Sequence, residues 1–209
     1  MARYTDASCK LCRRERQKLF LKGEKCYKST CPLESRNYPP GQHGKSRRAR
    51  LSDYSFQLRE KQKIRRTYGL LERQFRLYFE IASKKKGITG DNLVKILESR
   101  LDNTVYRLGF APSRKAARQL ITHRHFTVNG RTVNIPSYLL KPGDVIKVRE
   151  KSKTMNIIHS SMKQIKDDML VSWLNLDKAN MSGVFLHVPD RSEVPFIGNE
   201  QLVVELYSK

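Results

Sequence analysis

All four cysteines of this 209-residue chain lie among its first 31 residues. Their spacing is Cys9-x2-Cys12-x13-Cys26-x4-Cys31, which makes two close pairs on either side of a longer interval. Such pairs are typical of a tetrahedral structural metal site, because each pair lies on one tight turn and two turns can converge on one ion. The pattern therefore predicts one Zn2+ bound by four thiolates, which would cross-link a segment, residues 1–45, too small for a core of its own.

The sequence is also compatible with other roles for the four thiols. The same four thiolates can bind an iron–sulfur cluster, and disulfides or free thiols are further alternatives. Disulfides are the poorer explanation, because the first ten residues lack the apolar core of a signal peptide and the thiols of a cytosolic protein stay reduced. Between the two pairs, residues 19–25 (LFLKGEK) are expected to form a short hairpin with Gly23 near its tip.

The charge of the chain is strongly positive and unevenly distributed. Lysine and arginine number 42 against 20 aspartates and glutamates, a formal net charge of +22. Residues 1–50 carry net +10, residues 51–100 and 101–150 carry +6 each, and residues 151–209 are neutral. Such self-repulsion stabilises nothing in a free protein, so it indicates a polyanionic partner for the first three quarters of the chain. No stretch is apolar over the roughly 18 residues of a membrane helix, so we expect no membrane partner.

A linker with a basic run follows the cysteines. The sequence PPG at residues 39–41 cannot form helix or inner strand, so residues 32–50 are expected to be extended or turn-rich. Lys45, Arg47, Arg48 and Arg50 then lie close together and are interpreted as an arm that contacts phosphates.

The middle of the chain has helical periodicity. Ser52 can cap a strongly basic helix over residues 54–68, and the next helix, within residues 70–87, has apolar residues at intervals of three and four. Its aromatic side chains are therefore expected in a core. A third helix is predicted from Asp91 to about Leu101.

Residues 99–150 change in character. Ser113 is a predicted helix N-cap, and Arg114 and Arg118 follow it one helical turn apart, where they could bridge phosphates across an RNA groove. Asn129-Gly130, between alternating apolar residues, is a strong hairpin signal. The pattern predicts a small module of two helices packed on a few antiparallel strands.

These residues resemble a known family. RLDNTVYRLGFAPSRKAARQLITHRHFTVNGRTVNIPSYLLKPGDVIKV is similar to the RNA-binding domain named after ribosomal protein S4, a domain that also occurs in pseudouridine synthases and tyrosyl-tRNA synthetases. NYPPGQHG, REKQKIRRTYGLLERQF and NEQLVVELYSK resemble the bacterial ribosomal protein family itself, in its four-cysteine, zinc-site form. The resemblance covers essentially the whole chain.

The resemblance implies a function and several partners. Members of the family are structural constituents of the small ribosomal subunit and primary binders of its RNA, which nucleate assembly of the 5′ region at a helix junction. They lie near the mRNA entrance, touch a neighbouring subunit protein and affect translational accuracy. Some repress translation of their own operon. The implied location is the cytoplasmic ribosome, with Cys9, Cys12, Cys26 and Cys31 as metal ligands, and mRNA is a possible further partner.

The expected fold is α+β, with an N-terminal metal-bound knob, a helical domain and a small inserted two-helix, antiparallel-strand RNA-binding module. Residues 1–45 would form the knob, residues 46–98 the helical domain completed by a C-terminal return at 166–209, and residues 99–165 the module. The neutral return would place Leu202, Val203, Leu206 and Tyr207 in the core or against a protein.

The sequence and the resemblance together give a set of candidate RNA-binding residues. Ser113, Arg114, Arg118, His123 and Asn129 match the motif of the module. The full set is Arg13, Arg14, Lys45, Arg47, Arg48, Arg50, Lys61, Arg65, Arg66, Arg107, Ser113, Arg114, Lys115, Arg118, His123, Arg124 and Asn129.

Rival functions fit the sequence less well. An enzyme carrying this module needs a catalytic domain of a few hundred residues, and the chain has neither the length nor a glycine-rich phosphate loop, so we expect no enzyme and no small-molecule substrate. A DNA-binding regulator would display a recognition helix and a dimerising face, whereas the helix over residues 54–68 is basic all round. A standalone RNA-binding protein, of the heat-shock or operon-repressor kind, is the remaining alternative.

Overall fold

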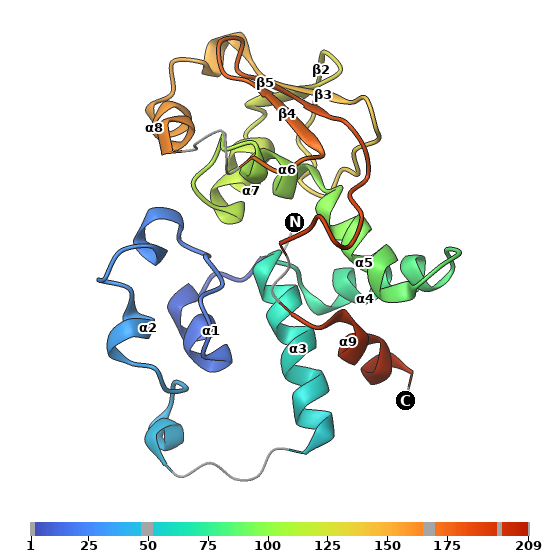
Figure 1. The fold of residues 1–209 in the computed structure, drawn as a ribbon. Helices are drawn as coiled ribbons and strands as arrows, with labels where there is room; N and C mark the ends of the chain where they lie inside the picture. Colours follow the sequence, from blue (N-terminus) through green and yellow to red (C-terminus); the bar gives the residue numbers. More distant parts are fainter. Residues whose placement is uncertain (1–2, 47–51, 165–169, 196–197, 209) are drawn as a thin grey trace. The chain divides into compact units, whose positions relative to one another are not determined.

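The structure is a computed structural model that describes residues 3–46, 52–164, 170–195 and 198–208. The chain divides into two compact units (Figure 1). Unit 1 contains residues 1–93 and 196–209, and unit 2 contains residues 94–195.

Unit 1 begins with short helices joined by turns. They are α1 (Ser8–Glu15), η1 (Gly23–Cys26), α2 (Pro32–Ser35) and η2 (Gln42–Lys45). Cys12, Leu19 and Leu21 form a small buried cluster, which is the core of this segment. The hairpin expected over residues 19–25 is wrong, because the chain after the turn at residues 21–22 enters the 3-10 helix η1 and forms no strand. This short helix delivers Cys26 into the interior.

The remainder of unit 1 is helical and includes the C-terminus. It contains α3 (Asp53–Thr67), α4 (Glu72–Ser83) and α9 (Glu200–Tyr207), and α9 lies along α3 (Figure 1). The Ser52 hydroxyl accepts from the Ser55 amide at 3.4 Å, which confirms the predicted cap. The apolar stripe of α4 is also confirmed, since Phe75, Tyr78 and Ala82 are buried.

The C-terminal helix packs on this core as expected. Val203 is fully buried, and the Tyr207 ring lies 4.5 Å from the Phe79 ring and 6.5 Å from the Phe75 ring, measured between centroids. The Gln57 side chain of α3 donates to Glu205 of α9 at 3.1 Å. Val203 is therefore part of the core of unit 1, and Leu202, Leu206 and Tyr207 are half-buried.

The helix predicted from Asp91 to about Leu101 is present but ends earlier than expected. It is α5 (Thr89–Glu98), and after an extended Arg100 a separate helix, α6 (Leu101–Arg107), begins. The Leu101 amide donates to the Tyr138 carbonyl at 2.8 Å and the Asp102 amide donates to the Pro136 carbonyl at 3.1 Å. Because these amides bond to a distant loop, they do not continue the helix.

Unit 2 packs helices on an antiparallel sheet. Its further helices are α7 (Arg114–Thr122), η3 (Glu150–Ser152) and α8 (Asn156–Gln164), and its strands are β1 (Phe126–Val128), β2 (Arg131–Thr132), β3 (Val145–Val148), β4 (Leu174–Asp177) and β5 (Ser182–Phe185). Among the described residues the strands follow the order β2-β1-β3-β5-β4, with every neighbouring pair antiparallel. Phe110 and Phe126 are fully buried, with ring centroids 5.8 Å apart. The predicted Asn129-Gly130 turn is confirmed, with φ angles of 49° and 78°.

The expected boundaries need correction at both ends of the module. Residues 174–185 belong to the sheet and not to the C-terminal return, because β5 pairs with β3 in the register Val145↔Val184. The return begins near residue 196 instead of 166. The boundary at the other end falls at residues 93–94, inside α5, and the cysteine segment belongs to the same compact unit as α3. The mixed helix and antiparallel-sheet class is as expected. No helix in the described ranges has the length and apolarity to cross a membrane.

Candidate nucleic-acid interface

The four cysteines come from the short helices at the start of unit 1. Cys9 and Cys12 lie on α1, Cys26 ends η1, and Cys31 is the N-cap of α2. All four are free thiols, with Cys12, Cys26 and Cys31 buried and Cys9 half-buried. This fold brings the two sequence pairs into one small segment.

The surroundings of the thiols contain influences that act against the thiolate form and others that favour it. Burial raises the pKa of the Cys12 thiol, and a hydrogen bond from the Leu19 backbone opposes this rise. The charges of the other three cysteines raise the pKa of Cys12 further, so all three are close enough to interact electrostatically with Cys12. The Lys22 amide donates to Cys26 Sγ at 3.3 Å. Amides that point at sulfur stabilise its anionic form, as does a bound cation. Among the described residues, however, no three cysteine, histidine or acidic side chains lie so that they could hold a metal ion.

Basic side chains of the same segment are held by an aromatic ring. Arg13 Nε donates to the Tyr38 carbonyl at 3.1 Å, and its guanidinium lies 4.8 Å from the centre of the Tyr38 ring. Lys45 Nζ lies 5.3 Å from the same ring centre. Arg14 is exposed. Tyr38 therefore positions two of the candidate RNA-binding cations, whereas Arg47, Arg48 and Arg50 lie outside the described residues.

The candidate residues of α3 are engaged in ion pairs within unit 1. Lys61 is 8% exposed and pairs with Glu72, and Arg65 lies 3.3 Å from the same carboxylate. Burial alone would raise the pKa of Glu72, but the hydrogen bond from Lys61 and the two positive charges lower it. The structure thus gives Lys61 a structural role, and its contact with RNA stays a prediction.

A buried carboxylate links α1 to α3. The Glu15 side chain is 1% exposed and pairs with Arg66 and, at 3.3 Å, with Arg59. Burial raises the pKa of Glu15 although both arginines oppose the rise, and burial lowers the pKa of each arginine. Sequence reasoning missed Glu15. The signal in the sequence was that Glu15 is a lone acidic residue among the basic residues that follow Cys12.

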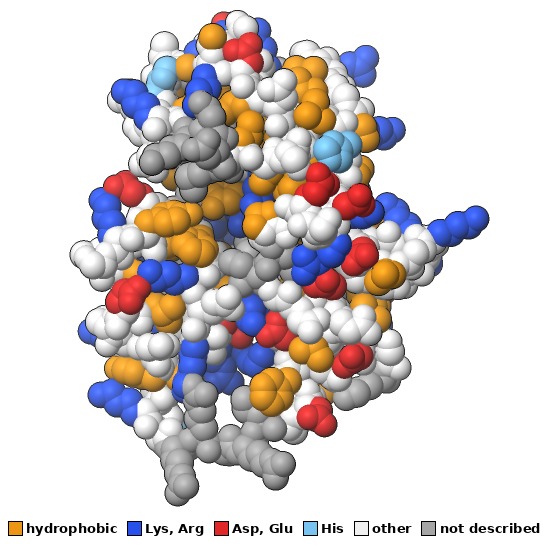
Figure 2. Space-filling view, in the orientation of Figure 1, with side chains coloured by type: hydrophobic (Ala, Val, Ile, Leu, Met, Phe, Trp, Pro, Cys, Tyr) orange, Lys and Arg blue, Asp and Glu red, His pale blue; other side chains and the backbone are white. Residues whose placement is uncertain are grey.

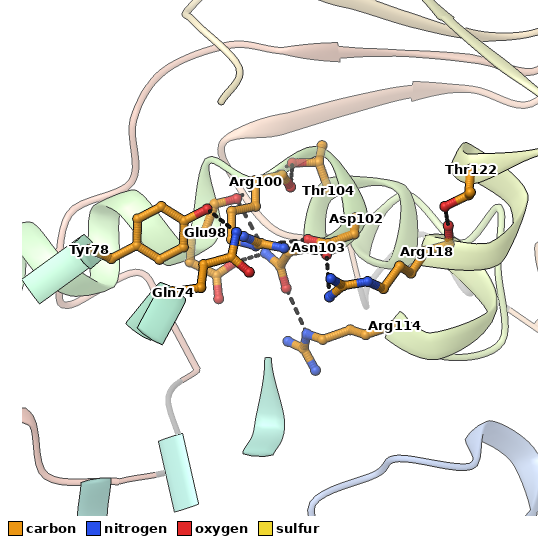
Figure 3. A network of polar contacts seen from close by, with 10 residues as sticks. All are labelled: Gln74, Tyr78, Glu98, Arg100, Asp102, Asn103, Thr104, Arg114, Arg118 and Thr122. Atoms are coloured by element: carbon orange, nitrogen blue, oxygen red, sulfur yellow. Dashed lines mark hydrogen bonds and ion pairs between the residues drawn. The ribbon is translucent and has the colours of Figure 1, made fainter. Parts of the chain in front are cut away.

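In unit 2 the predicted arginines belong to a polar network (Figure 3). Glu98 is fully buried and accepts from Arg107 Nη2 at 2.8 Å and Nε at 3.2 Å. Asp102, 3% exposed, accepts from Arg100 Nε at 3.0 Å and lies 3.8 Å from Arg118 Nη1. These arginines are therefore fixed by buried acidic groups through charge-assisted hydrogen bonds and ion pairs.

The start of α7 follows the prediction. The Ser113 hydroxyl accepts from the Ala116 amide at 3.3 Å and caps the helix. Arg114, Lys115 and Arg118 are half-buried on its first turns. Arg114 Nε donates to Asn103 Oδ1 at 2.8 Å, a contact that the sequence does not signal.

The loop after α7 carries another group of cations. His123 and Arg124 are exposed, and the Arg124 carbonyl accepts from Arg149 Nη1 at 3.0 Å. His125 Nδ1 lies 2.9 Å from the Ser152 hydroxyl, and burial, with His123 and Arg149 nearby, lowers the His125 pKa. The candidate list omitted His125 and Arg149, although the charge run KVREK at residues 147–151 could have indicated the latter.

Asn129 has a role inside the fold. Its Nδ2 donates to Asp144 Oδ1 at 2.8 Å and its Oδ1 accepts from the Val145 amide at 2.9 Å. These bonds tie the β1–β2 turn to the start of β3. The match of Asn129 to the RNA-binding motif is thus explained by folding, and its contact with RNA stays a prediction.

Figure 2 shows Lys and Arg side chains on the surface interspersed with Asp and Glu side chains, and the chain as a whole carries a formal net charge of +22. A surface of this kind attracts a phosphate backbone through charge, and arginines that are held in place add geometric selectivity.

Comparisons with known proteins give the family. Residues 3–98 match the model of the ribosomal protein S4/S9 N-terminal domain, and residues 99–146 match the S4 domain. The chain is 57% identical to the small ribosomal subunit protein uS4 of Syntrophobacter fumaroxidans and 56% identical to that of Thermus thermophilus. It is also 57% identical to the uS4 protein of Acetivibrio thermocellus. Each comparison covers 100% of both chains.

Proposed function

The chain belongs to the uS4 family of small ribosomal subunit proteins, and from this premise we propose how it binds RNA and what holds its basic segments in place. It is a structural constituent of the small subunit, binds ribosomal RNA and is not an enzyme. Its place in bacteria is the cytoplasmic ribosome. The observation that carries this function is identity above 50% over the full length of several uS4 proteins.

The proposed RNA surface has two parts. One contains Arg13, Arg14 and Lys45 beside the cysteines, and the other contains Arg114, Lys115 and Arg118 on α7 together with the loop at residues 123–125. The target is the 5′ region of the small-subunit RNA at a helix junction, where early binding would nucleate assembly. Shape and phosphate positions, more than base edges, are what such a surface recognises in structured RNA.

The finer placements are part of the same proposal. The family resemblance supports a position near the mRNA entrance, an effect on accuracy and contact with a neighbouring ribosomal protein through the helical and C-terminal part. Exposed apolar residues on unit 1 support a protein contact, since Leu77 is 52% and Ile88 65% exposed. Contact with mRNA rests on the resemblance alone.

We also propose one Zn2+ at Cys9, Cys12, Cys26 and Cys31. Four free thiols in one short segment, with a backbone amide that donates to Cys26, support this ligand set. When bound, the ion would cross-link the two cysteine pairs. An iron–sulfur cluster uses the same ligands and would be recognised by iron content and visible absorbance.

The function is tested by RNA binding across salt concentrations. We expect the full chain to bind the 5′ region of small-subunit RNA much more tightly than an unrelated structured RNA at every salt concentration, while both affinities fall as salt rises. Equal affinities that vanish together would mean that the protein acts only as a polycation, and specific RNA binding would have to be abandoned.

A further inference from the structure

Asn103 is a neutral polar residue inside α6 that belongs to no predicted site. Its side chain is 1% exposed. Nδ2 donates to Glu98 Oε2 at 2.6 Å and to the Glu98 carbonyl at 3.2 Å, and Oδ1 accepts from Arg114 Nε at 2.8 Å (Figure 3). The amide therefore bridges a buried carboxylate and the first arginine of α7.

The carboxylate fixes which way the amide points. Glu98 forms an ion pair with Arg107, and a carboxylate has only acceptors to offer, so the donor end of Asn103 faces it. The acceptor end of the amide then necessarily faces Arg114. An alanine at position 103 would lose this acceptor without any change in net charge.

Arg114 is also held by Tyr106, which lies on α6 together with Asn103. The Arg114 guanidinium lies 4.6 Å from the centre of the Tyr106 ring. A hydrogen bond at Nε sets the direction of the guanidinium fork, and the ring restricts its plane. A long side chain held at two points loses less rotamer freedom when it binds a phosphate. Part of the entropic cost of ordering Arg114 is then already met when the protein folds.

We propose that Asn103 is a positioning residue for RNA binding, which acts by orienting the Arg114 guanidinium toward a backbone phosphate, with Tyr106 as its support. The inference rests on the proposed function, because it requires Arg114 to contact RNA. Asn103 itself is too deeply buried to reach RNA, so any effect of its substitution on RNA affinity passes through a neighbour.

The competing explanation is purely structural: Asn103 would serve only to satisfy Glu98. Both explanations allow Asn103→Ala to lower stability, but only the positioning role makes its effect on RNA affinity depend on Arg114. A double-mutant cycle separates the two, because side chains that act as a unit are non-additive.

The experiment measures the Kd of the full chain for the 5′ region of small-subunit RNA in wild type, N103A, R114A and the double variant, with melting temperatures in parallel. We expect N103A to raise Kd roughly 3- to 10-fold and R114A at least as much, with the double variant equal to R114A. The inference would be overturned if N103A raised Kd by the same factor in the R114A background as in wild type. It would also be overturned if R114A left Kd unchanged. In either case wild-type discrimination between RNAs, which tests the proposed function, would be unaffected.

A second pair of variants covers the case in which N103A does not fold. Tyr106→Phe keeps the ring face and should leave Kd within about twofold of wild type, whereas Tyr106→Leu removes it and should raise Kd by roughly 2- to 5-fold. Equal losses in the two variants would contradict a supporting role for the ring.

Discussion

The two proposed RNA-binding regions hold their cations in different ways. In unit 2, Arg107 and Arg114 are tied to Glu98 and Asn103, which belong to the interior of a well-packed module. In the cysteine segment, Arg13 and Lys45 are positioned by Tyr38, and the segment itself has only a small core around Cys12. A large core can orient a cation by buried polar groups, whereas we propose that the short basic segment depends on the zinc cross-link.

The largest effect is expected from removal of that cross-link. Cys9→Ser together with Cys12→Ser should abolish binding of one zinc equivalent and unfold most of residues 3–46, because a structural zinc site contributes on the order of 10 kcal/mol in small domains. The measurement is metal content combined with limited proteolysis. Residues 52–208 should stay protected, and cooperative loss of protection throughout the chain would contradict the difference between the two regions.

The second-largest effect is expected from loss of the Glu98–Arg107 ion pair in unit 2. Glu98→Ala leaves Arg107 buried without its carboxylate and should lower the free energy of unfolding by about 3–5 kcal/mol. Denaturant unfolding of the full chain measures it. Glu80→Ala is the matched control, because its pair with Arg76 is solvent-exposed and worth no more than about 0.5 kcal/mol. Similar losses in the two variants would mean that burial of the network is unimportant.

The link between α1 and α3 should appear as a dependence on pH. Burial raises the folded-state pKa of Glu15 above its ordinary 4.5, so the folded state holds this proton more tightly than the unfolded state does. Its contribution to stability is therefore fully present below pH 4.5 and is lost as pH rises through the folded pKa. The free energy of unfolding, measured from pH 4.5 upward, should therefore decline in wild type as Glu15 ionises. Glu15→Gln should lack this decline. Identical pH profiles in variant and wild type would show that Glu15 titrates normally.

The smallest effect is expected at Tyr38. Tyr38→Leu loses the ring beside Arg13 and Lys45 and should weaken RNA binding about 2- to 5-fold with little change in melting temperature. Tyr38→Phe keeps the ring and should bind like wild type. A Tyr38→Leu variant with unchanged affinity would mean that these two cations need no positioning.

Local signals in the sequence predicted the local structure well. Ser52 and Ser113 cap their helices, Phe75 and Ala82 are buried on one face of α4, and Asn129-Gly130 forms the expected turn. Each depends on residues close together in the sequence, whose preferences act before any tertiary contact forms.

Long-range contacts account for what the sequence did not reveal. The helix break at Arg100 depends on carbonyls of Pro136 and Tyr138, more than 30 residues away. The sheet extends to β5 by pairing with β3, and Gly183 of β5 packs against Leu108, where an added Cβ would lie 2.6 Å from the leucine side chain. The role of Asn103 likewise requires a partner 11 residues away on another helix. A single sequence carries no local mark of such pairings.

The most direct test combines metal removal with one arginine variant. The Kd for the 5′ region of small-subunit RNA is measured for wild type and R114A, each before and after treatment with a zinc chelator. Chelation should weaken binding by both proteins, and R114A should cost the same factor with and without metal, because Arg114 is oriented by Asn103 and Tyr106 and not by the cysteine segment. An unchanged Kd after chelation, or an R114A effect that disappears with the metal, would contradict separate anchoring of the two regions.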